Sequence, residues 1–420
     1  IGQETFTLPT TPLRTLVIHL TALLKRYDPD LILSDWGDTW LFPYLLDYCQ
    51  AEKFDYFNPN RDDRCTVHRK KENSYFTYGQ VGYRGAPSHL FGRWHIDRRN
   101  AMMFGEYGLE GVFEQARVTG LPVQEIARKS PGAGITAMQM LTALRTGILV
   151  PYQKQQAERP KTAAQLIRAD RGGLVYQPIT GLHTDVAELD FVSMYPSIMA
   201  HFNLSPETVG VHCSNAEIIP ELGIPVDISR PGLVPVTLRP LLEKRIALKQ
   251  WINALDRRDC RYTSLKARAA ALKWLLVVCF GYLGYKNARY GRIEGHEAVT
   301  AYGRESLIRA KEAAEDLEYR VLHLYVDGLW IAKPGANTVP ACQPVMDEIL
   351  NRTGLPLALE GIYKWIAFLP SRMDSRVPVP NRYFGVFQNG DLKTRGIEAR
   401  RHDTPPWLAE MQMDMLQQLA

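Results

Sequence analysis

Over the first 150 residues, apolar side chains recur mostly with the period of an α-helix. The pattern predicts, in order, a helix at Leu13–Tyr27, a strand at Asp30–Leu33, and helices at Leu41–Cys49, Gly105–Gly120 and Ile135–Gly147. The polar and charged stretch Asn58–Asn73 predicts an exposed loop. The Ser-Pro-Gly-Ala-Gly sequence that starts at Ser130 predicts a break before the last of these helices.

A charged stretch, 159–171, ends at Gly172 and Gly173, and this change in composition indicates a domain junction. After the junction, an apolar run with the character of a strand ends at Asp190 and is followed by a tight Tyr-Pro-Ser turn. A carboxylate at a strand end beside such a turn can hold a divalent metal where a phosphate could reach it. Asp is also common at strand ends, so this residue alone leaves a purely structural role open.

Two long helical patterns, Leu241–Leu255 and Tyr262–Phe280, are joined by a polar connection and predict an antiparallel helix pair. Further along, an apolar run, an Asp-Gly pair at Asp327 and a second apolar run predict a hairpin. A lone Asp-Gly pair is in most cases only a turn. An amphipathic pattern at Trp407–Leu419 predicts one more helix.

Composition and charge narrow the class of protein only slightly. The chain has 420 residues, of which 45% are hydrophobic and 23% charged, which suits two or three globular domains. The net charge of +5 permits nucleic-acid binding without requiring it. The six cysteines are scattered without a C-x-x-C pair, which argues against a disulfide framework or a zinc site and favours a reducing cytosol. No uninterrupted apolar run reaches the roughly 18 residues that span a bilayer. The chain begins at Ile1 without a signal-peptide pattern, which indicates a trimmed product.

The sequence around Asp190, D-F-x-S-x-Y-P-S-I, resembles the first polymerase motif of the family B DNA polymerases. The resemblance implies that Asp190 binds catalytic metal. It also implies that Tyr195 packs under the sugar of the incoming nucleotide and excludes a 2′-hydroxyl. Glu188 and Ser193 are interpreted as packing or turn residues. Nucleotidyl transfer by two metals needs a second carboxylate that is distant in the sequence.

We assign that second carboxylate to Asp327, because the surrounding sequence resembles the third family B motif, Y-x-D-T-D followed by a small residue and an apolar strand. Alignment from the downstream side matches Asp327 to the second, metal-binding Asp and places Tyr325 at the first. In the alternative register Asp327 is the first Asp and Leu329 takes the place of the second, which predicts an inactive site. We favour the first register because its downstream match continues without a gap.

Cations for a triphosphate are expected on the predicted helix pair. Arg245 and Lys249 are four residues apart, and Lys266 and Lys273 are seven apart, so each pair shares one helix face. Spacing alone favours an ordinary solvated helix pair. The resemblance to the first fingers helix and to the second polymerase motif implies instead that Arg245, Lys249 and Lys273 bind phosphate oxygens.

The second polymerase motif, K-x3-N-S-x-Y-G-Y-x-G-Y, is matched only in part. Lys273 and the Gly-Tyr-x-Gly-Tyr frame are present, but Val277, Val278 and Phe280 replace the Asn, Ser and Tyr of the motif. In the family these positions face the incoming nucleotide and the templating base, so the resemblance places Phe280 in the nucleotide site. The departures call fidelity and efficiency into question, but not phosphate binding.

The first region resembles the exonuclease-like domain that precedes the catalytic domain in family B polymerases. Leu41 and Gly111 stand where the exonuclease motifs carry metal-binding Asp residues, and neither can coordinate a metal. Asp35 or Asp38 could substitute, although Asp residues in loops usually serve turns. We therefore expect a degenerate, structural domain.

Basic residues alternate along the last predicted strands, a pattern that suits contacts to the backbone of a DNA duplex. The residues expected to contact DNA are Arg382, Tyr383, Lys393, Arg395, Arg400 and Arg401. The stretch Thr394–Gly396 resembles the strand that follows the duplex in the family, and Trp407–Leu419 resembles the first helix of its thumb.

With this resemblance, the sequence predicts an α+β fold built as a polymerase right hand. The expected parts are an antiparallel-sheet palm, two-helix fingers and a truncated thumb, preceded by a degenerate RNase H-like exonuclease domain. The predicted regions are 1–150 for the exonuclease-like domain, 151–238 for a linker and the first part of the palm, 239–280 for the fingers, 281–400 for the second part of the palm, and 401–420 for the start of the thumb.

The resemblance implies template-directed DNA synthesis with two Mg²⁺ ions, or Mn²⁺ in their place, and without proofreading. The expected substrates are primer-template DNA and deoxynucleoside triphosphates, and the expected partners include a sliding clamp or other replication and repair proteins. We expect a cytoplasmic, nucleoid-associated protein with no membrane contact. Translesion synthesis is a hypothesis that rests on the altered fidelity residues. Two alternatives remain: an inactive polymerase fold that binds DNA or acts as a scaffold, and an active 3′–5′ exonuclease, which Leu41 and Gly111 oppose.

Overall fold

The computed structural model describes residues 4–54, 56–77, 80–153, 158, 160–169 and 171–420. The chain divides into two compact units: unit 1 comprises Ile1–Leu141 and Lys244–Val278, and unit 2 comprises Thr142–Glu243 and Cys279–Ala420. Both divisions in the second half of the chain fall inside long helices, α8 (Leu233–Ala254) and α9 (Cys260–Gly284). The boundaries of these two compact units therefore differ from those of the five regions predicted from the sequence. Arg159, at the start of the predicted junction, lies outside the described residues.

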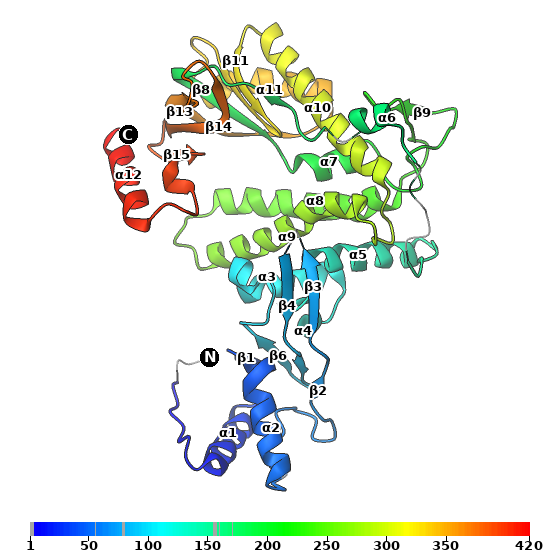
Figure 1. Ribbon diagram of the computed structural model, residues 1–420, viewed down its shortest axis with the longest axis vertical. Helices are drawn as coiled ribbons and strands as arrows, with labels where there is room; N and C mark the ends of the chain where they lie inside the picture. Colours follow the sequence, from blue (N-terminus) through cyan, green and yellow to red (C-terminus); the bar gives the residue numbers. More distant parts are fainter. Residues whose placement is uncertain (1–3, 55, 78–79, 154–157, 159, 170) are drawn as a thin grey trace. The chain divides into compact units, whose positions relative to one another are not determined.

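Unit 1 contains short strands and several helices, which can be followed by colour in Figure 1. Its elements are α1 (Leu13–Tyr27), β1 (Leu31–Ser34), η1 (Gly37–Leu41), α2 (Phe42–Ala51), β2 (His68–Arg69), β3 (Asn73–Thr77), β4 (Gln80–Arg84), β5 (Ser88–His89), β6 (Trp94–Asp97), α3 (Phe104–Thr119), α4 (Val123–Ile126) and most of α5 (Pro131–Arg145), together with the last part of α8 and most of α9. Strands β1 and β6 pair in parallel, whereas β2 pairs with β5 and β3 with β4 in antiparallel fashion. The helix predicted at Leu13–Tyr27 is confirmed with the same bounds.

The break predicted at Ser130 is wrong, because α5 begins there instead of later. The Ser130 hydroxyl accepts a hydrogen bond from the main-chain N–H of Ala133 at 3.4 Å. Pro131 occupies the first position of the helix, where its missing N–H and its fixed φ cost little. The Ser-Pro sequence is therefore a helix start, and the two glycines that follow are inside the first turns.

Unit 2 is built on a seven-stranded antiparallel sheet with the order β15-β14-β13-β8-β12-β11-β7. Its strands are β7 (Val175–Tyr176), β8 (Gly181–Phe191), β11 (Arg320–Tyr325), β12 (Gly328–Ala332), β13 (Leu357–Pro370), β14 (Pro378–Phe387) and β15 (Leu392–Arg395). A separate small pair consists of β9 (Ala216–Ile218) and β10 (Pro225–Asp227). The remaining elements are α6 (Ala163–Arg168), α7 (Met194–His201), α10 (Ile293–Asp316), α11 (Val339–Thr353), η2 (Glu398–Arg400) and α12 (Pro406–Gln418).

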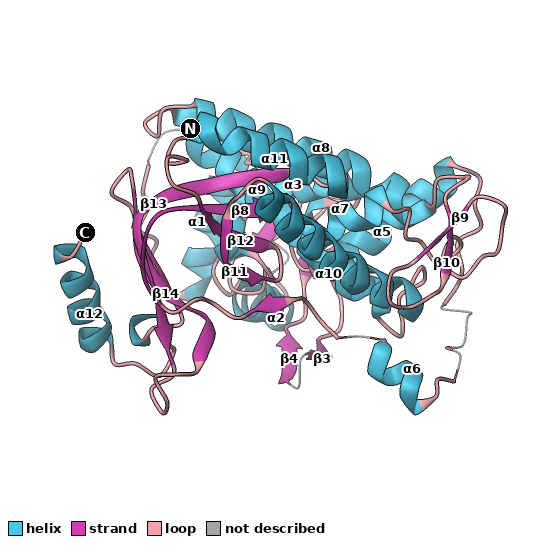
Figure 2. Ribbon diagram, turned by 90° about the horizontal axis from the view of Figure 1, so that it is seen from above, coloured by secondary structure: helices cyan, strands magenta, loops and turns pink. Residues whose placement is uncertain are grey.

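Strand β8 lies in the middle of this sheet, between β12 and β13. Its residues Val186, Ala187 and Leu189 are all buried, as expected for a central strand that is covered on both faces. Helix α10 packs against β11, β12 and α7, and α11 packs against α10 and β13 (Figure 2). An aromatic core on the sheet includes Trp330 and Tyr363. These contacts fix the end of β8 that carries Asp190.

Among the described helices, one, α9, is long and apolar enough by length and composition to cross a membrane. Length and composition are weak evidence, because the core helix of a soluble protein meets the same test. Helix α9 also carries exposed lysines, Lys266 and Lys273, on its surface.

Candidate active site

Asp190 and Asp327 come together at one end of the unit 2 sheet. Asp190 is the penultimate residue of β8, and its register partner on the neighbouring strand β12 is Gly328, which directly follows Asp327. The main-chain N–H of Phe191 donates a hydrogen bond to the carbonyl oxygen of Asp327 at 2.9 Å. Strand pairing therefore brings together the main chains of two aspartates that are far apart in the sequence.

The turn that carries Asp327 is tight and strained. Tyr325 and Gly328 are register partners, so Val326 and Asp327 alone connect β11 to β12. Val326 has a φ of 59°, a left-handed conformation that a β-branched residue rarely adopts. Its N–H donates to the carbonyl oxygen of Leu174 at 3.0 Å, which helps to stabilise this conformation. Backbone strain of this kind is concentrated at functional sites, so it indicates that the turn has a function. The hairpin predicted here is confirmed.

The electrostatic surroundings of Asp327 favour the binding of a cation. Its side chain reaches solvent, yet the protein around the turn removes part of its water shell and raises the pKa of its carboxyl. The negative charge of Glu360 raises that pKa further. Asp327 makes no ion pair with any residue in the described part of the chain. Two acidic groups near one another destabilise their own charged forms, and a bound cation relieves that cost.

Glu360 was missed in the sequence, because its position depends on an irregularity of β13. The pairing of β13 with β8 shifts between Leu359 and Gly361, so Glu360 is the extra residue of a β-bulge. Ala358, two residues earlier, is the register partner of Asp190. The alternation of apolar and polar residues along a strand does not predict where a bulge occurs. The sequence therefore did not indicate that the exposed carboxylate of Glu360 lies near Asp327.

The donor set fits a divalent metal that shares its coordination with other ligands. Within the described residues, no group of three or more His, Cys, Asp or Glu side chains is arranged to hold a metal by itself. Asp190 and Asp327 supply hard carboxylate oxygens, which Mg²⁺ and Mn²⁺ prefer. Mg²⁺ in proteins is commonly bound by one or two carboxylates together with water and substrate phosphates. The residues present therefore fit such a site.

Tyr195 and Phe280 are also brought together in unit 2. Tyr195 lies in the first turn of α7, directly after the strand that carries Asp190, and Ser193 precedes the helix in a left-handed conformation with φ 49°. The rings of Tyr195 and Phe280 are 4.6 Å apart between centroids and tilted by 51°. Both residues are half-buried, so neither is sealed in the core.

The three predicted phosphate-binding cations, Arg245, Lys249 and Lys273, belong to unit 1. Lys249 and Lys273 are exposed, and Arg245 is half-buried. The helices that carry them are longer than predicted: α8 begins at Leu233 instead of Leu241, and α9 ends at Gly284 instead of Phe280. The three residues stay a prediction for the triphosphate site.

Helices α8 and α9 are held together by a buried carboxylate from α3. Glu114 is fully buried and forms ion pairs with Lys244 of α8 and, at 2.8 Å, with Arg268 of α9. Although burial works in the opposite direction, these two cations hold the pKa of Glu114 below its ordinary value. Lys244 and Arg268 lie on either side of the connection 255–259 and reach the same carboxylate, as expected for two antiparallel helices. Sequence reasoning missed this anchor.

Several of the predicted DNA contacts are used inside the protein. Tyr383 is only 1% exposed and belongs to the sheet core, so the prediction that its side chain contacts DNA is wrong. Lys393 pairs with the buried carboxylate of Glu188 at 2.7 Å, and the same carboxylate accepts a hydrogen bond from the Tyr363 hydroxyl at 2.7 Å. Arg382 is mostly buried and donates to the carbonyl oxygen of Pro370 at 2.7 Å.

The other three basic residues remain at the surface. Arg395, Arg400 and Arg401 are exposed, and Arg401 pairs with the exposed Asp403 at 2.7 Å. An exposed pair of this kind contributes little to stability and can be exchanged for a contact to phosphate. These residues stay predictions for DNA binding.

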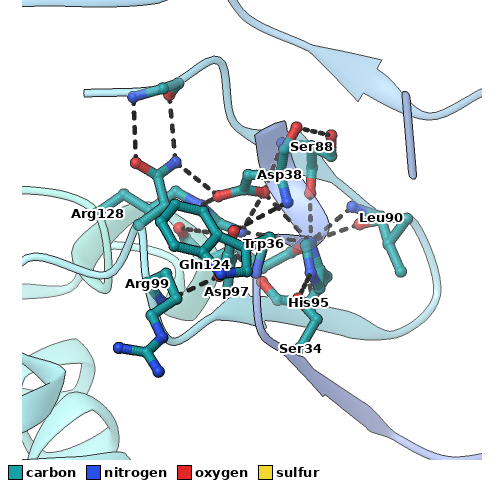
Figure 3. A network of polar contacts seen from close by, with 12 residues as sticks. Ser34, Trp36, Asp38, Ser88, Leu90, His95, Asp97, Arg99, Gln124 and Arg128 are labelled. Atoms are coloured by element: carbon teal, nitrogen blue, oxygen red, sulfur yellow. Dashed lines mark hydrogen bonds and ion pairs between the residues drawn. The ribbon is translucent and has the colours of Figure 1, made fainter. Parts of the chain in front are cut away.

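In unit 1, Asp38 is the centre of a buried polar network (Figure 3). Its carboxylate is 0% exposed and accepts two hydrogen bonds from the guanidinium of Arg128, at 2.7 and 2.9 Å. The N–H of Ser88 and the side-chain amide of Asn100 donate to it as well, each at 2.8 Å. Although burial works in the opposite direction, Arg128 holds the pKa of Asp38 below its ordinary value. A carboxylate with this many donors has no need of a metal ion.

The other candidates for an exonuclease site offer no better metal ligand. Asp35 lies on the surface and pairs with Arg98 at 2.7 Å. Gly111 is buried against the ring of Tyr107, where even a Cβ atom would lie 2.4 Å from a ring carbon, so no carboxylate fits. Leu41 is half-buried at the start of α2. The buried network therefore commits Asp38 to the fold, and the suggestion that Asp35 replaces a missing ligand stays a prediction.

Comparison with known proteins gives relatives of this chain in sequence and in fold. A family model described as DNA polymerase family B matches residues 129–327. DNA polymerase 2 of Saccharolobus solfataricus is 32% identical over 288 residues, which is 69% of this chain and 42% of that protein. The DNA polymerase of Archaeoglobus fulgidus is 26% identical over 446 residues, which is 96% of this chain and 54% of that protein. The structure of the family B DNA polymerase from the hyperthermophilic archaeon Pyrobaculum calidifontis matches with a TM-score of 0.61 at 22% identity, covering 99% of this chain and 57% of that chain.

The fold is that of a family B polymerase, and its central sheet is antiparallel. The chain resembles the DNA polymerases of family B as a divergent relative. It spans about half the length of the relatives that it matches.

Proposed function

We propose that the chain is the catalytic part of a template-directed DNA polymerase that adds deoxynucleotides to the 3′ end of a primer. The observation that carries the proposal is the pairing of β8 with β12, which brings Asp190 and Asp327 to the same end of the sheet. The strained Val326 turn and the raised pKa of Asp327 support it further. The names of the relatives agree with this activity.

In the proposed mechanism, the primer 3′-hydroxyl attacks the α-phosphorus of a deoxynucleoside triphosphate and pyrophosphate leaves. Asp190 and Asp327 would hold two divalent ions, Mg²⁺ or Mn²⁺, which supply Lewis-acid stabilisation of the phosphate oxygens when bound. Arg245, Lys249 and Lys273 would neutralise the charge that develops on the leaving pyrophosphate.

The half-buried rings of Tyr195 and Phe280 would support the sugar of the incoming nucleotide. The phenol of Tyr195 lies on α7, immediately beyond the strand that carries Asp190, which suits a role next to the α-phosphate. A rigid aromatic floor at this position orients the sugar and leaves little room for a 2′-hydroxyl.

We also propose that proofreading is absent and that unit 1 contains a degenerate exonuclease domain. The carboxylate of Asp38 is committed to Arg128, and Gly111 has no room for a carboxylate. The first-motif ligands of an exonuclease are not assigned to any residue of the chain. Release of mononucleotides from single-stranded DNA in the presence of Mg²⁺ would contradict this part of the proposal.

Translesion synthesis is a finer hypothesis that rests on Val277, Val278 and Phe280, which replace polar residues of the second motif. A variant with Val277→Asn, Val278→Ser and Phe280→Tyr should misincorporate less often and should extend less efficiently past an abasic site. Primer extension on matched damaged and undamaged templates measures both ratios. Unchanged ratios in the variant would reject the hypothesis.

The alternative function, an inactive scaffold, is suggested by Tyr325, which stands where the family has an Asp. The register that would make the site inactive places Leu329 at the metal-binding position. Leu329 is fully buried in the sheet, which suits a core residue better than the remnant of a metal ligand. We therefore favour the active enzyme, with primer-template DNA as its partner. Binding to a sliding clamp and association with the nucleoid are further proposals.

The test is extension of a labelled primer with Mg²⁺ and all four deoxynucleotides. The chain is compared with Asp190→Asn and Asp327→Asn, and with Asp185→Asn, which changes another carboxylate of β8 away from the site. Asp185 has a φ of 52°, a conformation that Asn tolerates well, so this control should fold normally. Loss of extension in the first two variants and not in the third supports the proposal. Duplex binding without extension by the unmodified chain would favour the scaffold.

A further inference from the structure

A histidine on α10 completes the pair of rings at the proposed nucleotide site. The ring of His296 stacks on that of Phe280, with centroids 4.0 Å apart and planes within 16°. Phe280 in turn contacts the ring of Tyr195, at 4.6 Å. The three residues come from α10, α9 and α7, and all belong to unit 2. Phe280 therefore lies between two aromatic partners.

The chain provides specific room and orientation for this histidine. A Cβ atom at Gly284 would lie 2.8 Å from Cγ of His296, so the glycine lets the imidazole approach the end of α9. Nδ1 of His296 lies 3.2 Å from the carbonyl oxygen of Phe280, which fixes the ring over its stacking partner. Further along α10, a Cβ atom added at Gly303 would lie 3.4 Å from Cε1 of Tyr195, so this part of the helix borders that ring. One helix thus positions both aromatic residues.

Ordinary core packing would explain a histidine in such a contact if the rings were buried. His323 is an example, because it is fully buried and stacks on Trp330 in the sheet core. In contrast, His296, Phe280 and Tyr195 are all half-buried, so each of the three residues keeps some solvent exposure. A partly open aromatic stack beside the strand that carries Asp190 is suited to contact a ligand.

We propose that His296 is a positioning residue that holds Phe280 against Tyr195 and thereby sets the discrimination between deoxyribonucleotides and ribonucleotides. The inference rests on the proposed polymerase function and deepens it. Phe280 has no hydroxyl group, so no side-chain hydrogen bond orients its ring, and its described ring contacts are those to His296 and Tyr195. The imidazole on one face restricts its rotation, and Phe280 then restricts the ring of Tyr195. Without the imidazole, both rings gain freedom and the space for a 2′-hydroxyl increases.

The test compares His296→Ala and His296→Phe with the unmodified chain in steady-state primer extension, using deoxynucleotides and ribonucleotides. His296→Ala should raise KM for the deoxynucleotide about three- to tenfold, the loss expected from one stacked aromatic pair, with a smaller change in kcat. The ratio of kcat/KM for deoxynucleotide over ribonucleotide should fall by a similar factor. His296→Phe restores a stacking ring and should recover most of both values.

His183→Ala is the matched control. His183 also contacts a phenylalanine ring, Phe368, and its Nε2 lies 2.8 Å from a main-chain carbonyl oxygen, but it is at the opposite end of β8 from Asp190. This variant should leave both KM and the discrimination ratio unchanged. A KM and a ratio that are unchanged in His296→Ala, or changed equally in His183→Ala, would overturn the proposal.

A second readout separates this inference from the proposed function. Equilibrium binding of a deoxynucleoside triphosphate, followed by its stabilisation of the protein against heat, does not require catalysis. If the unmodified chain fails to extend a primer, the polymerase proposal is rejected, and binding then decides the role of His296. Weaker nucleotide binding by His296→Ala than by His296→Phe supports it, whereas equal binding by both variants and the unmodified chain rejects it.

Discussion

Asp38 in unit 1 and Asp327 in unit 2 are both aspartates that follow or join short strands, yet their surroundings are opposite. The carboxylate of Asp38 is fully buried, and Arg128, Ser88 and Asn100 all donate hydrogen bonds to it. Asp327 reaches solvent on a strained turn and is close enough to Glu360 for the two charges to repel. The pKa of the first carboxyl is lowered and that of the second is raised.

The difference shows that the partners of a carboxylate decide its role. An aspartate whose charge is neutralised by an internal guanidinium contributes to folding and has no reason to bind a metal. An aspartate that is kept close to another negative charge costs folding energy, and that cost is recovered when a cation binds. Unit 1 and unit 2 therefore illustrate a closed and an open carboxylate site in one chain.

The largest expected effect on stability comes from removing the cation that pairs with the buried carboxylate of Asp38. Arg128→Ala leaves the carboxylate of Asp38 buried without its cation, which should cost about 3–5 kcal/mol in the free energy of unfolding. Urea unfolding measures this change. Arg98→Ala, which removes the exposed partner of Asp35, should cost no more than about 1 kcal/mol. Equal effects of the two variants would contradict the distinction drawn for Asp38.

A double variant sharpens the same point. Asp38→Leu combined with Arg128→Met removes both charges and replaces them with apolar groups of similar size. The double variant should recover most of the loss seen in Arg128→Ala and come within about 1–2 kcal/mol of the unmodified protein. A double variant as unstable as Arg128→Ala would show that the other donors to Asp38, and not its charge, dominate.

Glu188 provides an intermediate case. It lies on the same strand as Asp190, but its carboxylate forms an ion pair with Lys393 and accepts a hydrogen bond from the Tyr363 hydroxyl. Lys393→Met should lower the free energy of unfolding by about 2 kcal/mol, since the buried carboxylate keeps, of its two partners among the described residues, the hydroxyl of Tyr363 alone. Primer binding should change little if Lys393 serves this internal role. A large loss of DNA affinity with unchanged stability would return Lys393 to the DNA contact first predicted for it.

The smallest effect is a pH dependence with opposite signs at the two main sites. A carboxyl whose pKa is raised in the folded protein favours folding when protonated, and this contribution is lost as pH rises through the raised pKa. The stability of Asp327→Asn relative to that of the unmodified protein should therefore increase as pH rises from about 4 to 7, by no more than about 1 kcal/mol because solvent screens the charge. The contribution of Asp38, whose pKa is lowered, is instead present above the ordinary pKa and lost as pH falls. Urea unfolding of Asp327→Asn across this range measures the first effect.

Much of the open site could be predicted from the sequence. Two local signals mark it: an apolar run that ends at Asp190, and an Asp-Gly pair between two apolar runs at Asp327. The resemblance to polymerase motifs then assigned both aspartates to one metal site. The structure then supplied the pairing of β8 with β12 that places them together. The expected fold was confirmed at the level of a family B polymerase with an antiparallel sheet.

The buried polar network around Asp38 could not be predicted, because the residues that donate to its carboxylate are distant from it in the sequence. Arg128 lies 90 residues after Asp38, and nothing in the sequence connects them. Tyr383 illustrates a second limit: an alternating strand has two faces, and only the packing of the sheet decides that Tyr383 faces the core. Glu360 illustrates a third, since a β-bulge depends on how β13 pairs with β8.

The most direct test of the open site is to measure primer extension and urea unfolding on the same Asp327→Asn protein at pH 7. We expect extension to fall by about a thousandfold or more, or ~4 kcal/mol in activation free energy, while the free energy of unfolding stays equal or rises slightly. Extension within about tenfold of the unmodified chain would contradict the assignment of Asp327 as a metal ligand. A loss of stability comparable to that of Arg128→Ala would show that Asp327, like Asp38, serves the fold.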